Sequence, residues 1–434
     1  MKESIKKRIE AVRRGEVPNG YRRDKLGIVP TEWEDKVLGD ILTQRKTLMC
    51  VSEEAPLLSF TIEEGVIDPK DKKSNKRDFL IKDMATKKFA LTEVGDIIYN
   101  PANLKFGAIH RNSLKRGVVS PIYGIFYGAP NSKFMGYFLH DQRFIDYAKT
   151  YTEGSVEKLK TLSADAFLKL KVTIPSLPEQ EKIAEILATC DRVIELKQQL
   201  LEEKRRQKQW LMQKLLDPNS GVRMPGFENS TWEKATMASL FTFGSSMAKS
   251  RDELSDEGDL YLHYGDIHAN ERYCIDAKAE YESIPKYDGS SPEKTHLHNG
   301  DVVFIDASED YDGISKFVVI ENCDGLVFIS GLHTIPCRSR DDRLTLHFKR
   351  YCFQTYQFKK QMAYYANGMK VYGISEKDFA KVEVVFPSQE EQRAIANVLD
   401  AISMNIELLE KEIEEIGNKK KALMQLLLTG LVRV

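Results

Sequence analysis

The residues with the clearest chemical potential are clusters of lysine and arginine interleaved with asparagine, histidine and tyrosine. In the first half of the chain they are Lys70, Lys72, Lys73, Lys76, Arg77, Arg111, Lys115 and Arg116. In the second half they are Lys249, Arg251, Tyr264, His268, Asn270, Arg272, Tyr311 and Lys316. Lysine and arginine neutralise phosphates, whereas arginine, asparagine and histidine read base edges. Each cluster taken singly also fits a solvated loop, so nucleic-acid binding is a hypothesis that needs other support.

No stretch of the sequence has the full pattern of a catalytic site. The run 99–103 (Tyr-Asn-Pro-Ala-Asn) is similar to the Asn-Pro-Pro-aromatic motif of adenine methyltransferases, but Ala102 and Asn103 replace the second proline and the aromatic residue that stacks on a flipped base. The run 71–73 (Asp-Lys-Lys) comes nearest to a nuclease triplet and lacks an acidic partner on a preceding strand. There is no G-x-G-x-x-G loop after a strand and no Walker A loop. We therefore expect a strand-to-loop turn and a solvated loop at these places, and no catalytic residue.

Histidine and cysteine spacing gives no metal-binding signature. His263, His268, His296 and His298 lack a helical i, i+4 pair with a general-base glutamate, and no cysteine cluster accompanies them. The six cysteines are scattered without a C-x-x-C pair, which suits a reducing compartment. The sequence predicts no metal, no cofactor of its own and a cytoplasmic protein.

Composition limits the class of protein. A chain of 434 residues is too long for one core, so two to four domains are expected. Its 42% hydrophobic and 30% charged residues are typical of a soluble globular protein. A formal net charge of -1 gives no global attraction to nucleic acid or membrane, so any DNA binding must come from local patches. No apolar run reaches the length of a membrane span.

A repeated helical motif organises the chain around these clusters. The run 174–180 (Ile-Pro-Ser-Leu-Pro-Glu-Gln) recurs at 386–392 (Phe-Pro-Ser-Gln-Glu-Glu-Gln), and each copy leads to a Leu-Met-Gln-x-Leu-Leu ending. The serine of each run can cap a helix, and Glu179 or Glu391, three residues later, completes a capping box. A long internal period of this kind indicates a duplicated architecture.

Each copy continues with apolar residues at alternating spacings of four and three. In the first copy these are Ile183, Leu187, Ile194, Leu201, Leu211 and Leu215, interrupted by Lys197, Lys204 and Lys208. In the second copy they are Ile395, Leu399, Ile402, Ile406, Leu409, Ile413, Ile416, Leu423 and Leu427, interrupted by Lys420. Such heptads predict a coiled coil, here two helices of about 38 residues and ~57 Å that pack on each other. A single amphipathic helix on a globular core is the alternative.

Two β-rich regions precede the helices and share a skeleton. Trp-Glu pairs at 33–34 and 232–233 open them, and Gly-Asp pairs at 95–96 and 300–301 each begin an apolar strand. A helix is expected near 134–147 in the first region and near 347–365 in the second. The sequences between these landmarks hardly match. Drift after an old duplication is one explanation, and loops that read different ligands on a fixed skeleton is the other.

The complete pattern resembles the specificity (S) subunit of Type I restriction–modification enzymes. The Pro-Ser-x-x-Glu-Gln helix starts, the helix endings, the Trp-Glu openings and the Gly-Asp strands carry the resemblance over essentially the whole chain. It implies two target-recognition domains that each read half of a bipartite site in double-stranded DNA, and two antiparallel helices that space them and dock two modification subunits. It also implies that the chain's two ends lie close together. S-adenosylmethionine and ATP would be bound by partner subunits, and whether two restriction subunits join stays open.

We therefore predict an α+β fold with two mixed α/β target-recognition domains, two long antiparallel coiled-coil helices and a pseudo-two-fold internal repeat. The predicted segments are a basic N-terminal helix (1–19), domain 1 (20–161), spacer helix 1 (162–221), domain 2 (222–373) and spacer helix 2 (374–434). Helices of ~57 Å would span about 17 base pairs. Two other classes remain open, namely a stand-alone DNA-binding scaffold of a defence locus without a methylase partner, and an enzyme with an unrecognised site.

Overall fold

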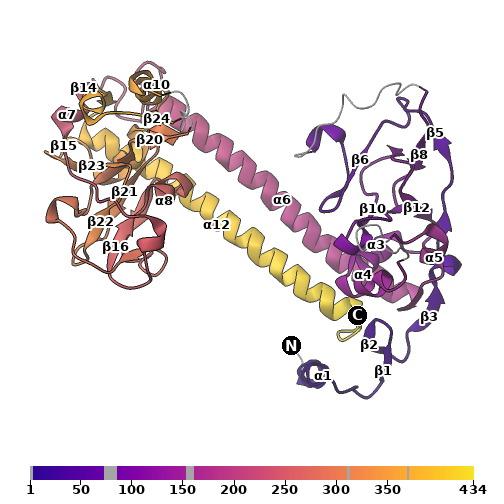
Figure 1. The fold of residues 1–434 in the computed structure, drawn as a ribbon. Helices are drawn as coiled ribbons and strands as arrows, with labels where there is room; N and C mark the ends of the chain where they lie inside the picture. Colours follow the sequence, from indigo (N-terminus) through magenta and orange to yellow (C-terminus); the bar gives the residue numbers. More distant parts are fainter. Residues whose placement is uncertain (1–2, 73–85, 153–160, 310–312, 369–370) are drawn as a thin grey trace. The chain divides into compact units, whose positions relative to one another are not determined.

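The computed structural model describes residues 3–72, 86–152, 161–309, 313–368 and 371–434. The chain forms two compact units. Unit 1 comprises Met1–Lys197 and Glu412–Val434, and unit 2 comprises Gln198–Lys411. Two long helices, α6 (Leu177–Leu215) and α12 (Gln389–Leu428), each contribute a segment to both units (Figure 1). The predicted combination of β-rich regions with two long helices is confirmed.

The strands of unit 1 form two main sheets and three smaller pairings. The four-stranded sheet has the order β10 (Ile109–Arg111), β9 (Ile97–Tyr99), β12 (Gly124–Tyr127) and β4 (Thr43–Gln44). The three-stranded sheet has the order β11 (Gly117–Val119), β8 (Phe89–Thr92) and β5 (Leu48–Met49). The pairs are β1 (Tyr21–Asp24) with β2 (Gly27–Pro30), β6 (Ser59–Thr61) with β7 (Gly65–Ile67), and β3 (Glu34–Val37) with β13 (Lys171–Ile174). The shorter helices are α1 (Glu3–Arg13), α2 (Leu38–Ile41), α3 (Ser132–His140), α4 (Gln142–Lys149) and α5 (Ala164–Leu168).

The larger sheet of unit 2 repeats the four-strand order of unit 1 with one additional strand, whereas the smaller sheet is arranged differently. The order in the larger sheet is β15 (Phe241–Phe243), β23 (Thr334–Ser339), β19 (Val302–Ile305), β21 (Phe317–Glu321) and β17 (Cys274–Asp276). The second sheet has the order β18 (Lys286–Tyr287), β16 (Asp259–Leu262) and β22 (Phe328–Ser330). The pairs are β14 (Glu233–Thr236) with β25 (Glu383–Phe386), and β20 (Ala307–Ser308) with β24 (Tyr372–Gly373). The shorter helices are α7 (Met237–Leu240), α8 (Tyr264–Ala269), α9 (Leu346–Cys352), α10 (Tyr356–Tyr365) and α11 (Glu376–Phe379).

The landmarks shared by the two halves have structural roles. In each unit the strand that leads into a long helix pairs with the strand that begins at a Trp-Glu pair. The aspartate of each Gly-Asp pair is buried, and Asp96 binds Arg45 through contacts of 2.8 and 2.9 Å. Asp301 binds Arg338 through contacts of 3.2 and 2.9 Å. A buried, paired carboxylate thus fixes the same strand in both units.

One detail of the predicted helices is wrong. The regions 134–147 and 347–365 each hold two short helices, because an N-cap residue restarts the helix in the middle of each. Asp141 accepts a hydrogen bond from the backbone of Arg143 at the start of α4, and Thr355 accepts one from Phe358 at the start of α10. A side chain that caps a new helix ends the previous one, and local apolar periodicity does not report this.

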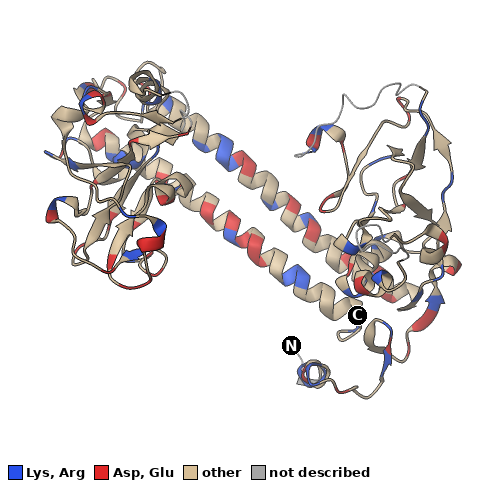
Figure 2. Ribbon diagram, in the orientation of Figure 1, with Lys and Arg blue, Asp and Glu red and all other residues tan. Residues whose placement is uncertain are grey.

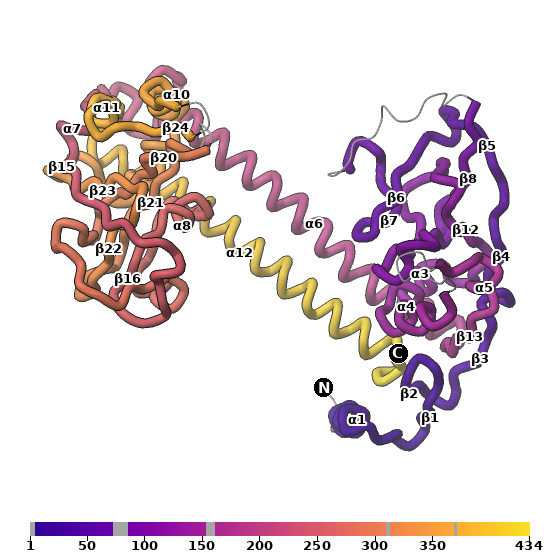
Figure 3. The backbone as a smooth tube through the Cα atoms, viewed as in Figure 1, coloured from indigo at the N-terminus to yellow at the C-terminus, as the bar shows by residue number. Residues whose placement is uncertain are grey.

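The ends of the long helices are part of the two cores. Ile183, Leu187 and Leu427 lie in the core of unit 1, whereas Leu215, Ile395 and Leu399 lie in that of unit 2. In each unit a segment of α6 lies beside an antiparallel segment of α12 (Figure 3). The predicted seam residues that are buried are Ile183, Leu187, Leu201, Leu215, Ile395, Leu399, Ile402, Leu409 and Leu427. The half-buried ones are Ile194, Leu211, Ile406, Ile413, Ile416 and Leu423.

The helices of the described residues include none long and apolar enough to cross a membrane. Basic and acidic residues are both distributed along the two long helices (Figure 2).

Candidate functional site

The first turn of each long helix does more than the predicted capping box. The Ser388 hydroxyl accepts a hydrogen bond from the Glu391 backbone at 3.4 Å, as expected of an N-cap. The sequence did not reveal the role of the glutamine in the motif. Its side-chain amide donates a hydrogen bond of 2.9 Å to the carbonyl of the motif proline in both copies, from Gln180 to Pro175 and from Gln392 to Pro387. The glutamate side chains bind residues far away in the sequence instead of closing the box.

In unit 1 this glutamate holds three distant segments together. The Arg433 guanidinium donates to both oxygens of the buried Glu179 carboxylate at 2.6 and 2.9 Å, and the Trp33 indole donates to it at 3.3 Å. Nearby, the Arg8 guanidinium donates to the Leu431 carbonyl at 2.7 Å. The N-terminal helix, the start of α6 and the last residues of the chain therefore meet, as the resemblance implied.

Two of the basic residues of domain 1 meet at one aspartate. Asp68 lies 3.8 Å from the Lys70 ammonium and 3.3 Å from that of Lys115, so the structure joins two clusters that are 45 residues apart in sequence. Lys72, two residues after Lys70 in the sequence, is half-buried. Arg116 pairs with Glu93 at 3.2 Å. Lys73, Lys76 and Arg77 lie outside the described residues.

Arg111 is set apart from that corner. Its guanidinium donates to the hydroxyls of Ser132 and Ser113, both at 3.0 Å, and burial lowers its pKa. Both contacts are with neutral oxygens, so its charge is not balanced by an ion pair within 4 Å among the residues that the structure describes. Its side chain is half-buried and therefore partly accessible to solvent, so Arg111 is a candidate for phosphate binding.

The basic residues of domain 2 mostly have acidic partners. The pairs are Lys249 with Glu253 at 2.8 Å, Arg251 with Asp266 at 2.8 Å, and Arg272 with Glu280 at 2.6 Å. The Lys316 ammonium lies 5.4 Å from the centre of the Tyr273 ring. The Asn270 side chain closes a turn, accepting from the Arg272 backbone and donating to the Cys274 carbonyl. This surface is therefore less basic than its sequence suggests.

A set of aromatic and histidine rings near this surface was only partly foreseen. Tyr264 and His268 are 6.4 Å apart between ring centres, and the His333 ring meets Tyr264 edge-on at 5.7 Å. The sequence analysis did not single out His333. Its signal would have been a histidine at the tip of a turn between two strands. Tyr311, also predicted there, lies outside the described residues.

The outward faces of the long helices carry exposed apolar residues. Leu196 of α6 and Leu408 of α12 are 47% and 54% exposed, and they occupy equivalent places, 212 residues apart, in the two copies of the repeat. Val193, three residues before Leu196, is 36% exposed, and Met404, four residues before Leu408, is 70% exposed. Residues three or four apart share a helix face, so each unit presents a small apolar patch.

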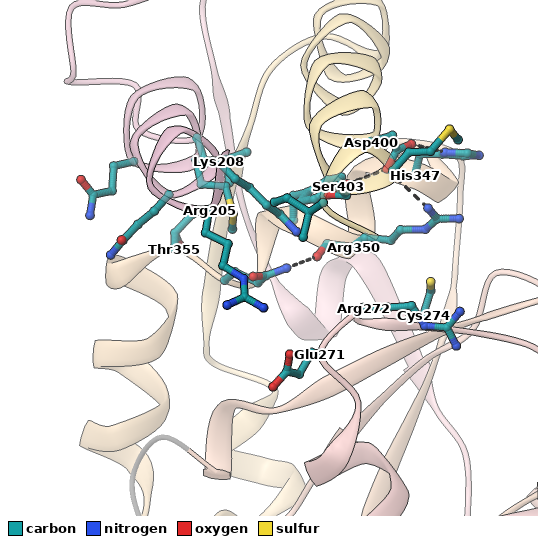
Figure 4. Close-up of a pocket in the computed structure, with 18 of the residues that line it drawn as sticks. Arg205, Lys208, Glu271, Arg272, Cys274, His347, Arg350, Thr355, Asp400 and Ser403 are labelled. Atoms are coloured by element: carbon teal, nitrogen blue, oxygen red, sulfur yellow. Dashed lines mark hydrogen bonds and ion pairs between the residues drawn. The ribbon is translucent and has the colours of Figure 1, made fainter. Parts of the chain in front are cut away.

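Unit 2 also has a groove of about 1160 Å³ between its long-helix segments and α9 and α10 (Figure 4). Asp400 binds His347 at 2.6 Å, Tyr351 at 2.5 Å and Arg350 at 3.4 Å on its wall. Lys208 also lines the groove, and burial lowers the pKa of its ammonium. The carboxylate is occupied by three donors, so the groove offers a charged lining rather than a free acid–base pair.

No group of three histidine, cysteine, aspartate or glutamate residues that could hold a metal ion occurs in the part of the chain that the structure describes. The six cysteines are unpaired thiols.

Two similar units built on a repeated long helix, with variable basic loops, define a family of DNA-specificity proteins. The chain belongs to the family of the Type I restriction modification DNA specificity domain, whose sequence profile matches residues 30–204 and 229–418. It is a specificity subunit of a type I restriction–modification system.

Particular relatives agree with this assignment. The chain is 23% identical to the type I restriction enzyme MjaVIII specificity subunit of Methanocaldococcus jannaschii, over 94% of each chain. It is 24% identical to another protein of that organism, provisionally named the type I restriction enzyme MjaX specificity subunit, over 95% of this chain and 97% of the relative. The solved S subunit of the type I system from M. genitalium matches in fold with a TM-score of 0.56 at 14% identity, over 95% of this chain and 97% of that one.

Proposed function

We propose that the chain is a non-catalytic subunit in which each β domain reads one half of a split DNA sequence. The observation that supports this most directly is the repeat. The two units share the order of four strands in their larger sheets, the paired aspartates and the helix junctions, but differ in the loops that carry basic and aromatic residues. A shared skeleton with different loops suits two readers with different targets, because specificity comes from a few side chains at the base edges.

Domain 1 offers phosphate contacts at the corner where Asp68 joins Lys70 and Lys115. These ion pairs lie at the surface, where ion pairs are weak, so phosphates can compete for the lysines at little cost. In domain 2, Lys249, Arg251 and Arg272 likewise have carboxylate partners in surface ion pairs, so phosphates can compete for them in the same way.

The two long helices would dock two modification subunits. Equivalent exposed leucines, Leu196 and Leu408, suit two copies of the same partner, since a repeated surface binds a repeated ligand. S-adenosylmethionine would be bound by those partners, and ATP by restriction subunits where these join. We expect the complex to act in the cytoplasm, where unpaired cysteines persist.

The test is to map methyladenine across the genome of cells that carry this chain with its neighbouring genes, and of a strain that lacks only this chain. We expect one split motif, two short specific parts around a fixed number of unspecified bases, to lose methylation in the deletion strain. Unchanged methylation would favour the alternative, a DNA-binding scaffold without a methylase partner. Methylation or nicking by the purified chain alone would contradict the non-catalytic assignment.

Partner docking is tested separately with Leu196→Asp and Leu408→Asp. Each is expected to reduce co-purification of the modification subunit at least tenfold, and Asn405→Asp adds the same charge to an exposed position without removing an apolar side chain. The seam variant Ile406→Asp with Leu409→Asp should break the helix pair or the docking. A seam variant that assembles and directs methylation normally would contradict the packing of these residues.

A further inference from the structure

The turn between β22 and β23 holds a histidine in a backbone conformation that histidine rarely adopts. His333 has a φ of 60°, in the left-handed region. Such a conformation is strained for a residue with a side chain and persists only where the surroundings enforce it. Here Asp306 enforces it twice, because its backbone N–H donates to the His333 carbonyl at 3.2 Å and its carboxylate contacts the His333 Nδ1 at 3.2 Å.

The ring is fixed and still accessible. The His333 side chain is 46% exposed. It lies perpendicular to the ring of Tyr264, which begins helix α8 and whose ring centre is 4.5 Å from that of His263. The His263 ring in turn accepts a hydrogen bond from the backbone of Gly265 at 3.0 Å. Three segments of unit 2 therefore hold one exposed imidazole in a defined orientation.

Unit 1 has a ring pair at the corresponding place in its fold, with different chemistry. The turn between β11 and β12 carries Tyr123, whose ring lies 5.2 Å from that of Phe60 in β6. The neighbouring Ile122 is 65% exposed at the tip of that turn. The same turn thus presents apolar atoms in unit 1 and an imidazole in unit 2, where the Asp306 carboxylate lies beside the imidazole. This is the expected difference between two readers built on one skeleton.

We infer that His333, oriented by Asp306 and Tyr264, reads a base edge in the half-site that domain 2 recognises. This inference rests on the proposed function. The charge around the ring argues for a base and against a phosphate, because Asp306 lies beside it and Glu309 follows in the same segment. With Nδ1–H donating to Asp306, Nε2 is left to accept a hydrogen bond, so the partner is an amino group in the major groove, adenine N6 or cytosine N4.

The variant His333→Gly tests base recognition by the histidine while leaving the fold of unit 2 intact. Glycine adopts a left-handed φ without strain, so the turn should be retained and unit 2 should fold at least as well. We expect the methylated motif in cells to relax at one base pair of one half-site, with roughly a 5- to 100-fold loss of preference there and the other half-site unchanged. The control Asn322→Gly changes another left-handed residue, in the turn before β22, and should leave the motif intact.

The chemistry of the contact is tested with the purified complex of this chain and its modification subunits. A duplex in which the amino group of the relaxed base is removed should bind the native complex at least fivefold more weakly, and should bind the His333→Gly complex as well as the intact duplex. An unchanged motif, a uniform loss of methylation, or relaxation in both half-sites would overturn the inference. If the native chain directs no split motif, the proposed function fails first, and the two failures are thereby distinguished.

Discussion

The two copies of the helix junction have the same residues, but these residues have different hydrogen-bond partners in the two units. In unit 1 the Glu179 carboxylate accepts hydrogen bonds from the side chains of Arg433 and Trp33. In unit 2 the equivalent Glu391 carboxylate accepts a hydrogen bond from the Ser230 hydroxyl at 2.5 Å. Its second oxygen and the Trp232 indole N–H are buried without a hydrogen-bond partner among the described residues. One junction is locked by an ion pair, and the other carries unsatisfied polar atoms of the kind that cost about 1–3 kcal/mol each.

A lysine in the helix seam shows the same asymmetry. Lys420 pairs with Asp191, which also accepts from the Tyr137 hydroxyl at 2.6 Å. The equivalent lysine of the first copy, Lys208, has no hydrogen bond or ion pair within reach among the described residues. The Asp400 carboxylate, which lines the same groove as Lys208, is occupied by other donors. Duplication preserved the residue types in the helices, and each unit's neighbouring loops then decided whether those residues are paired.

The largest expected effect comes from isosteric removal of the two glutamate charges. Glu179→Gln should destabilise unit 1 by about 2–3 kcal/mol, because it removes the buried carboxylate that binds the Arg433 guanidinium and leaves only the exposed Glu32 carboxylate, at 3.0 Å, as its ion-pair partner. Glu391→Gln should change unit 2 by less than about 1 kcal/mol, since the buried charge has no cationic partner there. Hydrogen exchange resolved by unit measures both, because a two-unit chain does not unfold as one transition. Equal losses in the two variants would show that the junctions are equivalent.

The next largest expected effect is a loss of stability of unit 1 at acidic pH. Burial and the neighbouring His140 lower the pKa of His110 to about 4, from an ordinary value of 6.5. The folded state therefore excludes a proton that the unfolded chain binds, and unit 1 should lose about 2–3 kcal/mol as the pH falls from 6.5 to 4. Exchange rates of the β6–β7 and β10 amides against pH would report it. The variant His110→Gln, which keeps a donor for the Ile62 carbonyl, should flatten that dependence, and a profile that matches the native one would assign it to another group.

The seam lysines should give the smallest effects, with opposite signs. Lys208→Met should stabilise unit 2 by about 1 kcal/mol, because it removes a desolvated charge, whereas Lys420→Met should destabilise unit 1 by a similar amount. The lowered pKa of Lys208 also means that the stability of unit 2 rises with pH toward 10.5, as the folded state loses its proton first. That rise should vanish in Lys208→Met, and a destabilised Lys208→Met protein would instead show that the ammonium is well paired.

Local rules in the sequence account for the helices and the repeat. Caps and heptad spacing involve residues three to seven apart, so the two long helices, with 39 and 40 residues, match the expected length of about 38. The Gly-Asp and Trp-Glu pairs could be recognised as landmarks, but their roles depend on partners such as Arg45 and Glu179, which are 51 and 146 residues away. A repeated pattern reveals that a place matters, and only the fold reveals what it contacts.

The candidate site was less accessible to sequence reasoning for the same reason. Lysine and arginine are easily found in a sequence, but their availability depends on acids such as Asp68, Glu253 and Asp266 that arrive through folding. His333 was missed because its defining property is a backbone angle imposed by Asp306, which lies 27 residues earlier. The clusters of charge therefore point to candidate regions, whose part in DNA binding stays a prediction.

The composition of unit 1 has a consequence for how the protein is made. Residues 198–411, which form unit 2, are continuous and can fold as soon as the ribosome releases them. Unit 1 needs Leu427, Leu428 and Arg433 for its core and its junction, although its first 197 residues emerge long before. During synthesis the first half must wait, incompletely packed, while the second half matures. A chaperone that protects this nascent chain would therefore act on the N-terminal half, and a late nonsense mutation would harm the domain at the beginning of the gene.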